Sequence, residues 1–203
     1  MRMLAIETAT EACSVALFEN GVLLEARHEV LGRGHAERLV PMIAELPERG
    51  RAQEIRVSLG PGSFTGVRIG LAVARALGIA WQARVRGFPT LALVAAMARG
   101  QGAIPVTVCM TGGHGEWFVQ DFGGDGLPLD TVASLAPELA AARDLPGEIA
   151  GSKAEELAAR KAMDPGTIRL PEASSALDLP AELLSDTLAP LYGRPPDAKL
   201  PGR

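Results

Sequence analysis

The sequence contains few aromatic residues and few cysteines. Phe, Trp and Tyr account for 4% of its 203 residues, so the core must be aliphatic and rich in alanine, and few rings are available for stacking on nucleobases. The two cysteines, Cys13 and Cys109, both lie in apolar runs that are typical of strands. This placement favours two buried free thiols, although a disulfide between them stays open on the sequence alone.

An excess of positive charge is also lacking. Lys and Arg number 20 against 24 Asp and Glu, and proteins that grip nucleic acid unaided usually carry net positive charge. No uncharged apolar stretch reaches the ~18 residues of a membrane helix. Glu7 interrupts the first apolar run too early for a signal peptide. We therefore expect a cytoplasmic protein with no membrane contact and no direct hold on nucleic acid.

Constellations typical of catalysis are scarce. No two of the three histidines are three or four residues apart, which argues against a metal site: His28, His35 and His114. We expect His35 to be a surface or capping residue and expect no metal and no cofactor. Glu7, beside Thr8 and Thr10, is the only acid placed where a catalytic carboxylate could sit, although a salt-bridged or strand-end Glu is the commoner explanation.

The first half of the chain is predicted to form strands followed by helices. Asn20-Gly21 between two apolar runs predicts a tight hairpin, so the chain opens with three antiparallel strands. The first predicted helix contains Pro41, which costs roughly 3 kcal/mol in a helix interior, so this helix either starts late or is kinked. The expected strands are 3–8, 13–19, 22–29, 55–59 and 85–88, and the expected helices are 35–46, 64–81 and 89–98.

A glycine-containing stretch at 99–102 is the best candidate boundary between two lobes. We expect an N-terminal lobe at 1–102 and a smaller C-terminal lobe at 103–203. The second half has predicted strands at 104–110 and 116–122, and helical patterns at 134–143, 153–163 and 180–186. Strands that run into helices in both halves predict an α/β protein with mixed sheets flanked by helices.

The glycine loop at 59–68 follows a predicted strand and opens a long helix, which is the usual geometry of a phosphate site. The specific nucleotide motifs fail, because no Lys followed by Ser or Thr comes after the last glycine and the dinucleotide spacing is not met. A tight turn that brings the helix close to the sheet and a nucleotide-facing loop both stay open. The candidate nucleotide-facing residues are Glu7, Thr8, Thr10, Gly60, Gly62 and Ser63.

The long helix carries small residues at every fourth position. Glycine inside a helix costs up to about 1 kcal/mol against alanine, so this ridge needs a compensating close contact. One interpretation is packing against the protein's own sheet or first helix; another is an intermolecular helix bundle, in which Gly70→Leu would abolish association and leave the monomer folded. The candidate interface residues are Leu39, Ile43, Gly66, Val67, Gly70, Leu71, Ala74 and Gly78.

Four segments resemble one known family. The segments 3–17 and 59–71 look like the two signatures of the TsaB family, also called YeaZ, and 35–42 and 190–194 are similar to further conserved family stretches. The resemblance covers about residues 1–98, returns at the C-terminus and is weak between. It implies an actin-like (ASKHA) fold of two lobes.

The family resemblance also implies a function. Members are the non-catalytic partner of the enzyme TsaD, which, with TsaE and ATP, transfers a threonylcarbamoyl group to the adenosine beside the anticodon of certain tRNAs. The resemblance implies that TsaD is the direct partner, that TsaE and tRNA are reached only through the complex, and that the chain forms a homodimer when alone. The resemblance also implies that the complex with TsaD and the homodimer both form through the first two helices of the chain.

Several positions depart from related proteins. By motif order, the two metal-binding histidines of the catalytic paralogue correspond here to Thr90 and Val94. The first strand usually ends in Asp and here ends in Glu7, and a family Asp-Ala-Arg segment is replaced by Thr111-Gly112-Gly113. Two alternatives from other classes stay open: an ATP-dependent small-molecule kinase of actin-like fold and, with least support, an M22-type metallopeptidase.

Overall fold

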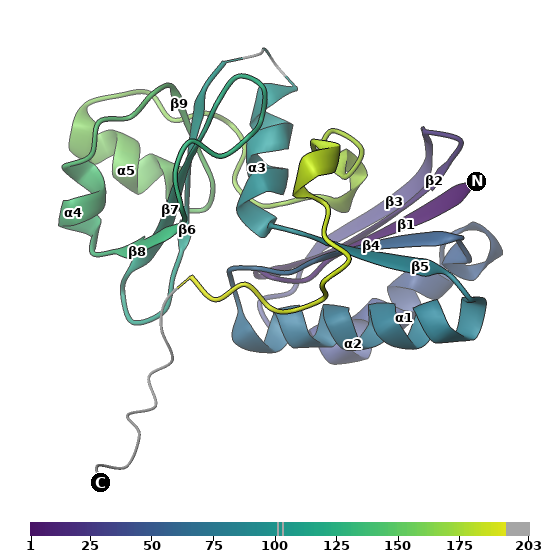
Figure 1. Cartoon of the computed structure of the whole chain (residues 1–203). Coiled ribbons are helices and arrows are strands. Elements are labelled where there is room, and N and C mark those ends of the chain that lie inside the picture. Colours follow the sequence, from purple (N-terminus) through teal and green to yellow (C-terminus); the bar gives the residue numbers. More distant parts are fainter. Residues whose placement is uncertain (101, 103, 194–203) are drawn as a thin grey trace, which may run out of the picture.

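The computed structural model describes residues 1–100, 102 and 104–193. Figure 1 shows two lobes, each built around one β-sheet with helices packed on it. The predicted lobe boundary at 102 stays a prediction. The last ten residues of the predicted C-terminal lobe, which include Arg194 of the family stretch at 190–194, lie outside the described residues. The α/β class with mixed sheets is confirmed, because each sheet combines parallel and antiparallel pairs.

The N-terminal sheet has five strands in the order β3-β2-β1-β4-β5. The predicted hairpin at Asn20-Gly21 is confirmed: Asn20 and Gly21 both have positive φ, and Glu19 pairs with Val22 across the turn. β4 then pairs in parallel with both β1 and β5. The strands are β1 (Arg2–Glu7), β2 (Ala12–Glu19), β3 (Val22–Val30), β4 (Glu54–Ser58) and β5 (Arg84–Phe88).

Two helices, α1 (His35–Ala44) and α2 (Phe64–Trp81), cover one face of this sheet (Figure 1). α1 begins at His35 and continues through Pro41. The helix therefore does not start late, and it accommodates the proline in its interior. α2 matches its predicted range in full. Of the described helices, α2 alone is long and apolar enough to cross a membrane, and it lies along the sheet with its small residues inward.

Period-two alternation divides the strand side chains between the two faces of the N-terminal sheet. Leu4 and Ile6 of β1 belong to the large core under α1 and α2. Met3 and Ala5 point to the opposite face, where they pack against η2 (Ala173–Ser175) from the end of the chain. Glu7 follows the same alternation and is therefore on the face away from α1 and α2.

The C-terminal sheet has four strands in the order β8-β7-β6-β9, with only three residues in each edge strand. α3 (Thr90–Arg99) lies between the two sheets in Figure 1 and packs on the C-terminal sheet. The other elements are β6 (Val106–Thr111), β7 (Trp117–Phe122), β8 (Ala133–Leu135), α4 (Pro137–Ala141), β9 (Glu148–Ala150), α5 (Ala154–Lys161) and η1 (Pro47–Gly50).

Two helical predictions in the second half are wrong in part. The segment 134–143 begins as strand β8, and α4 starts only at Pro137, where the proline suits the first helical turn. The segment 180–186 forms a single 3-10 turn, η3 (Ala181–Leu183), and then pairs with the edge of β5 through Ser185. These short segments form strand pairs in spite of their helical pattern, because a helix of only two turns is weakly stabilised by its own hydrogen bonds.

Candidate functional site

The glycine loop is held tightly against the end of β1. The Ser63 amide donates to Ala9 O at 2.6 Å, and the Ser63 hydroxyl caps α2 by accepting from Gly66 N at 3.2 Å. A side chain at Gly62 would overlap the backbone of Ala9. The loop therefore works as a tight turn that brings α2 close to the sheet, which is one of the two interpretations that the sequence left open.

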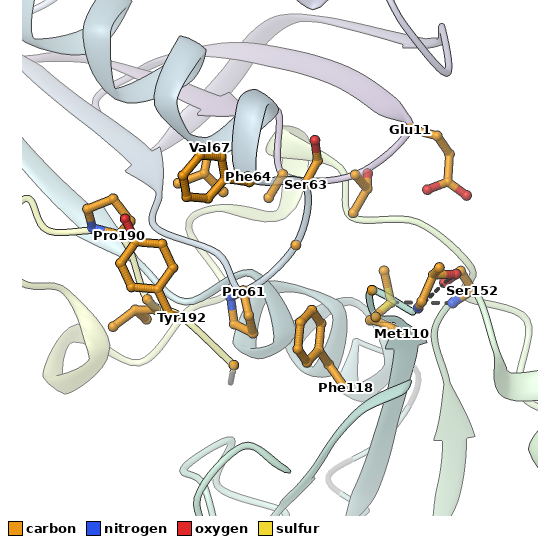
Figure 2. Close-up of a pocket in the computed structure, with 18 of the residues that line it drawn as sticks. Glu11, Pro61, Ser63, Phe64, Val67, Met110, Phe118, Ser152, Pro190 and Tyr192 are labelled. Carbon is orange, nitrogen blue, oxygen red and sulfur yellow. Dashed lines mark hydrogen bonds between the residues drawn. The ribbon is translucent and has the colours of Figure 1, made fainter. Parts of the chain in front are cut away.

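A cleft of about 900 Å³ separates the start of α2 from the C-terminal sheet. Its walls are largely apolar: Phe64 and Tyr192 stand on one side, with ring centroids 6.1 Å apart, and Met110 and Phe118 stand on the other (Figure 2). Arg68 also lines the cleft, and its guanidinium carbon lies 3.6 Å from the centroid of the Phe64 ring. Sequence reasoning missed these rings, because residues 190–193 join the cleft only through the tertiary fold.

The candidate nucleotide-facing residues divide into two groups. Thr10, Gly62 and Ser63 line the cleft. Glu7, Thr8 and Gly60 are absent from its walls, so the six residues do not all line this cleft, and their role toward a nucleotide stays a prediction. Thr8 lies beneath α2, where its hydroxyl donates to Gly66 O at 2.8 Å.

Glu7 is buried completely beneath the cleft. One carboxyl oxygen accepts from the Ala9 amide at 2.6 Å, whereas the other oxygen and the hydroxyls of Ser58 and Thr90 have no hydrogen-bond partner of good geometry among the described residues. Burial raises the pKa of Glu7 to about 7, and the Ala9 amide offsets part of that rise. Neither a salt bridge nor an exposed catalytic carboxylate describes this group, which is instead a buried acid that carries its proton up to neutral pH.

The small-residue ridge of α2 packs on the protein's own sheet. Side chains added at Gly66 and Gly70 would overlap Thr8, and one added at Gly78 would lie 2.5 Å from Val85 Cγ2. The other candidate interface residues, Leu39, Ile43, Val67, Leu71 and Ala74, are buried in the same core. The assignment of these eight residues to an intermolecular surface is therefore corrected: their contacts are already made within the chain, and Gly70→Leu would disturb the fold itself.

Each of the helices α1 and α2 has a large apolar side chain exposed on its outer side. Val40 of α1 is 52% exposed and Ile79 of α2 is 82% exposed. Small apolar residues surround them on the two helices: Ala36, Pro41 and Ala44 on α1, and Ala72, Ala76 and Ala80 on α2. We call this surface the helix face. The exposed residues of the same helices also include Glu37 on α1 and Arg68 and Arg75 on α2, so this face offers another helix pair short apolar side chains beside a few charged ones.

The histidine and cysteine positions carry no catalytic geometry. His35 is buried, with its Nε2 3.1 Å from Ala12 O, so the expectation of a surface or capping residue is wrong. Cys13 and Cys109 are free and buried, as expected, and burial raises their pKa values to about 11 and about 12. Across residues 1–100, 102 and 104–193, no three His, Cys, Asp or Glu side chains cluster as metal ligands do.

The altered segment Thr111-Gly112-Gly113 forms part of the cleft rim. The Thr111 amide and hydroxyl both bond to the Ser152 hydroxyl, at 2.9 and 3.0 Å. Gly112 has no room for a side chain, since a Cβ there would lie 2.6 Å from Glu116 O. The segment therefore closes the β6–β7 hairpin and places short side chains, rather than charges, at the cleft.

Comparison with known proteins gives consistent matches. A family model described as TsaD, tRNA N6-adenosine threonylcarbamoyltransferase, matches residues 27–182. The tRNA threonylcarbamoyladenosine biosynthesis protein TsaB of Escherichia coli is 37% identical over 149 residues, which are 68% of this chain and 64% of that protein. The matched part thus spans less than two thirds of that relative's length. An uncharacterized protein of Mycobacterium tuberculosis is 33% identical over 97% of this chain and 93% of its own.

Solved structures agree with the sequence matches. YeaZ from Pseudomonas aeruginosa superposes with a TM-score of 0.77 at 30% identity, covering 94% of this chain and 99% of its own. The ethanolamine utilization protein EutJ from Carboxydothermus hydrogenoformans superposes with a TM-score of 0.52 at 11% identity, covering 88% of this chain and 89% of its own, which is a likeness of fold alone. The expected actin-like, two-lobed fold is thereby confirmed.

Proposed function

Because this chain belongs to the TsaB (YeaZ) family, we propose that it is a non-catalytic subunit in the biosynthesis of tRNA threonylcarbamoyladenosine. In this role it binds a TsaD-type transferase and activates it for transfer of threonylcarbamoyl to the adenosine beside the anticodon. The match of a TsaD family model to residues 27–182 supports a structural pairing of two similar chains. TsaE and tRNA are reached through the complex, in the cytoplasm.

The observation that carries this proposal is the helix face. Val40 and Ile79 remain exposed on two helices whose inner sides are fully packed. A partner that presents a similar helix pair would cover them and form a four-helix contact, with the short side chains allowing interaxial distances near the lower end of the 8–10 Å range. The same surface serves the expected homodimer, so TsaD and a second copy compete for it.

A non-catalytic role is supported by the chemistry of the nearby side chains. Glu7 is enclosed below the cleft, and Thr90 and Val94 occupy the positions that correspond to metal-binding histidines in the paralogue. Burial keeps the pKa values of both thiols far above neutrality, so neither forms the thiolate that a nucleophile requires. The cleft itself presents aromatic rings and short polar side chains.

The test is a helix-face variant, Val40→Asp combined with Ile79→Asp. Two carboxylates buried in an apolar interface should weaken TsaD binding by about tenfold or more. Binding is measured by co-purification with the TsaD of the same cell, and function by the threonylcarbamoyladenosine content of tRNA in a strain that lacks this protein. Leu129→Asp is the matched control, because Leu129 is 61% exposed on the other lobe. Full complex formation and full modification by the double variant would overturn the proposal.

The kinase and metallopeptidase alternatives predict other results. A kinase of actin-like fold would hydrolyse ATP as an isolated chain. In that case the ATP phosphates would lie near Thr10, Gly62 and Ser63 in the cleft. A metallopeptidase would hold stoichiometric zinc or iron. Turnover of ATP by the purified chain, unaffected by the helix-face variant, would favour the kinase.

A further inference from the structure

The outer edge of β3 is the one long strand edge that no other described element covers. β3 has nine residues and ends the order β3-β2-β1-β4-β5. The opposite edge, β5, is covered by Ser185, which exchanges two backbone hydrogen bonds with Gly87 at 2.7 and 2.9 Å. The edges of the C-terminal sheet are three residues long. Proteins usually keep exposed edges short or covered, so a long open edge calls for a partner.

The outward hydrogen-bonding groups of β3 follow from its inward ones. The Arg27 carbonyl accepts from the Ser14 hydroxyl of β2 at 3.2 Å, and the Leu31 amide donates to Glu11 O at 2.9 Å, so the odd-numbered residues face β2. Backbone groups alternate in direction along a strand. Ala26 and His28 therefore present their N–H and C=O groups away from the sheet, and the Ala26 carbonyl accepts from the Arg27 guanidinium of its own chain at 3.0 Å, a bond that a partner strand would replace.

The side chains of β3 are complementary to a second copy of the same strand. In an antiparallel pair centred on Ala26, Glu25 of each copy lies opposite Arg27 of the other, and the smallest side chain of the strand lies on the two-fold axis. Glu25 and Arg27 form an ion pair within the chain here and are each about one-third exposed, at 33% and 35%, so both can reach across the edge. Opposite charges directly across a strand pair are stabilising.

The ends of the strand fit the same arrangement. Val22 and Val30 are 65% and 64% exposed, and antiparallel pairing brings the Val22 end of one copy beside the Val30 end of the other. Leu24 is the extra residue with no partner on β2, between the pairs Phe18–Leu23 and Leu17–Glu25, so regular pairing begins only at Glu25. Glu29 is held by Arg38 of α1 at 2.9 and 2.5 Å, which keeps this stretch of β3 fixed against the helix layer.

We propose that β3 pairs antiparallel with β3 of a second copy, centred on Ala26, to give one continuous sheet across two molecules. This surface is separate from the helix face, since the edge of the sheet and the layer of α1 and α2 are different sides of the N-terminal lobe (Figure 1). A copy that is bound to a partner through its helices can therefore still pair through β3.

The test uses a cysteine at the two-fold axis in the full chain that carries Val40→Asp and Ile79→Asp, so that association through the helix face is removed. Directly opposed residues that exchange hydrogen bonds have Cα atoms about 5.5 Å apart, within the roughly 4.4–6.8 Å of disulfides. Ala26→Cys should thus give a mostly disulfide-linked dimer on oxidation, reversible with reductant. The native cysteines are both buried and do not compete.

Leu24→Cys is the matched control. In a pair centred on Ala26, residue 24 of one copy lies opposite residue 28 of the other, so the two introduced cysteines would be four residues, or about 13 Å, apart along the strands. It should remain monomeric on oxidation. Ala26→Pro removes the outward N–H without touching the pairing with β2, and sedimentation of the uncrosslinked chain should then show loss of the dimer. Absence of cross-linking for Ala26→Cys in a chain with an unchanged melting curve, or equal cross-linking of both cysteine variants, would overturn the proposal.

Discussion

The two faces of the N-terminal sheet are made from the same strands and differ in what covers them. Toward α1 and α2, Leu4, Ile6 and Val57 form an apolar core against which the glycine ridge of α2 packs. Away from these helices, Met3 and Ala5 pack on η2, and Glu7 lies opposite Ser14 in the strand register. Both faces are therefore packed, and the difference is that the face away from α1 and α2 also encloses the buried carboxyl of Glu7.

The largest expected effect comes from Gly70→Leu on the helix side of the sheet. The new side chain would overlap the Thr8 hydroxyl, with Val57 Cγ2 only 3.5 Å from its Cβ position. Overpacking of this kind costs about 3 kcal/mol or more in a site that cannot open. Urea unfolding should show the loss, and Ala72→Leu on the exposed side of α2 is the control. A variant that unfolds at the same urea concentration as the parent would mean that the ridge is not packed on the sheet.

Glu7→Gln tests the buried carboxyl on the face away from α1 and α2, and it should change how the free energy of unfolding depends on pH. Burial raises the pKa of Glu7 from 4.5 to about 7, so the folded state holds a proton that the unfolded chain has lost between those values. The stability contributed by this protonated carboxyl is full below about pH 4.5 and is lost as pH rises through 7, an expected difference on the order of 3 kcal/mol.

The measurement for Glu7→Gln is the free energy of unfolding at pH 5 and pH 8. The parent should lose stability between these values and the variant should not, because the amide stays neutral while still accepting from the Ala9 amide. Glu11→Gln at the cleft rim serves as the control and should keep the parent's pH dependence. Parallel pH profiles for parent and Glu7→Gln would rule out a buried protonated acid.

The smallest expected effect is that of Ser63→Ala, where the glycine loop enters α2. The serine hydroxyl accepts from Gly66 N at 3.2 Å, and loss of a helix N-cap costs about 1 kcal/mol. The cleft lining should otherwise be unchanged, so TsaD co-purification is expected to stay at the parent level. Thr65→Ala is the control in the same melting experiments, because Thr65 lies two residues after Ser63 and is exposed. Equal melting of the two variants would show that the hydroxyl caps nothing.

Much of the fold could be predicted because its elements carry strong local patterns. Asn20-Gly21 fixes a hairpin by its positive-φ preference, and α2 matched its predicted range because apolar residues recur at helical spacing along its eighteen residues in spite of three glycines. The site was less predictable. Tyr192 reaches the cleft from a segment more than a hundred residues away from Phe64, and no local pattern encodes that approach.

The sequence by itself determined the hairpin, the long helix at 64–81 and the family, since these depend on neighbours along the chain, but it left open whether the glycine loop is a tight turn or faces a nucleotide. Only the tertiary structure decided what the ridge at Gly66 and Gly70 contacts, because a row of small residues accepts any close backbone and the nearest one is the end of β1. It also decided the pKa of Glu7, because burial away from water is what raises the pKa of this carboxyl to about 7.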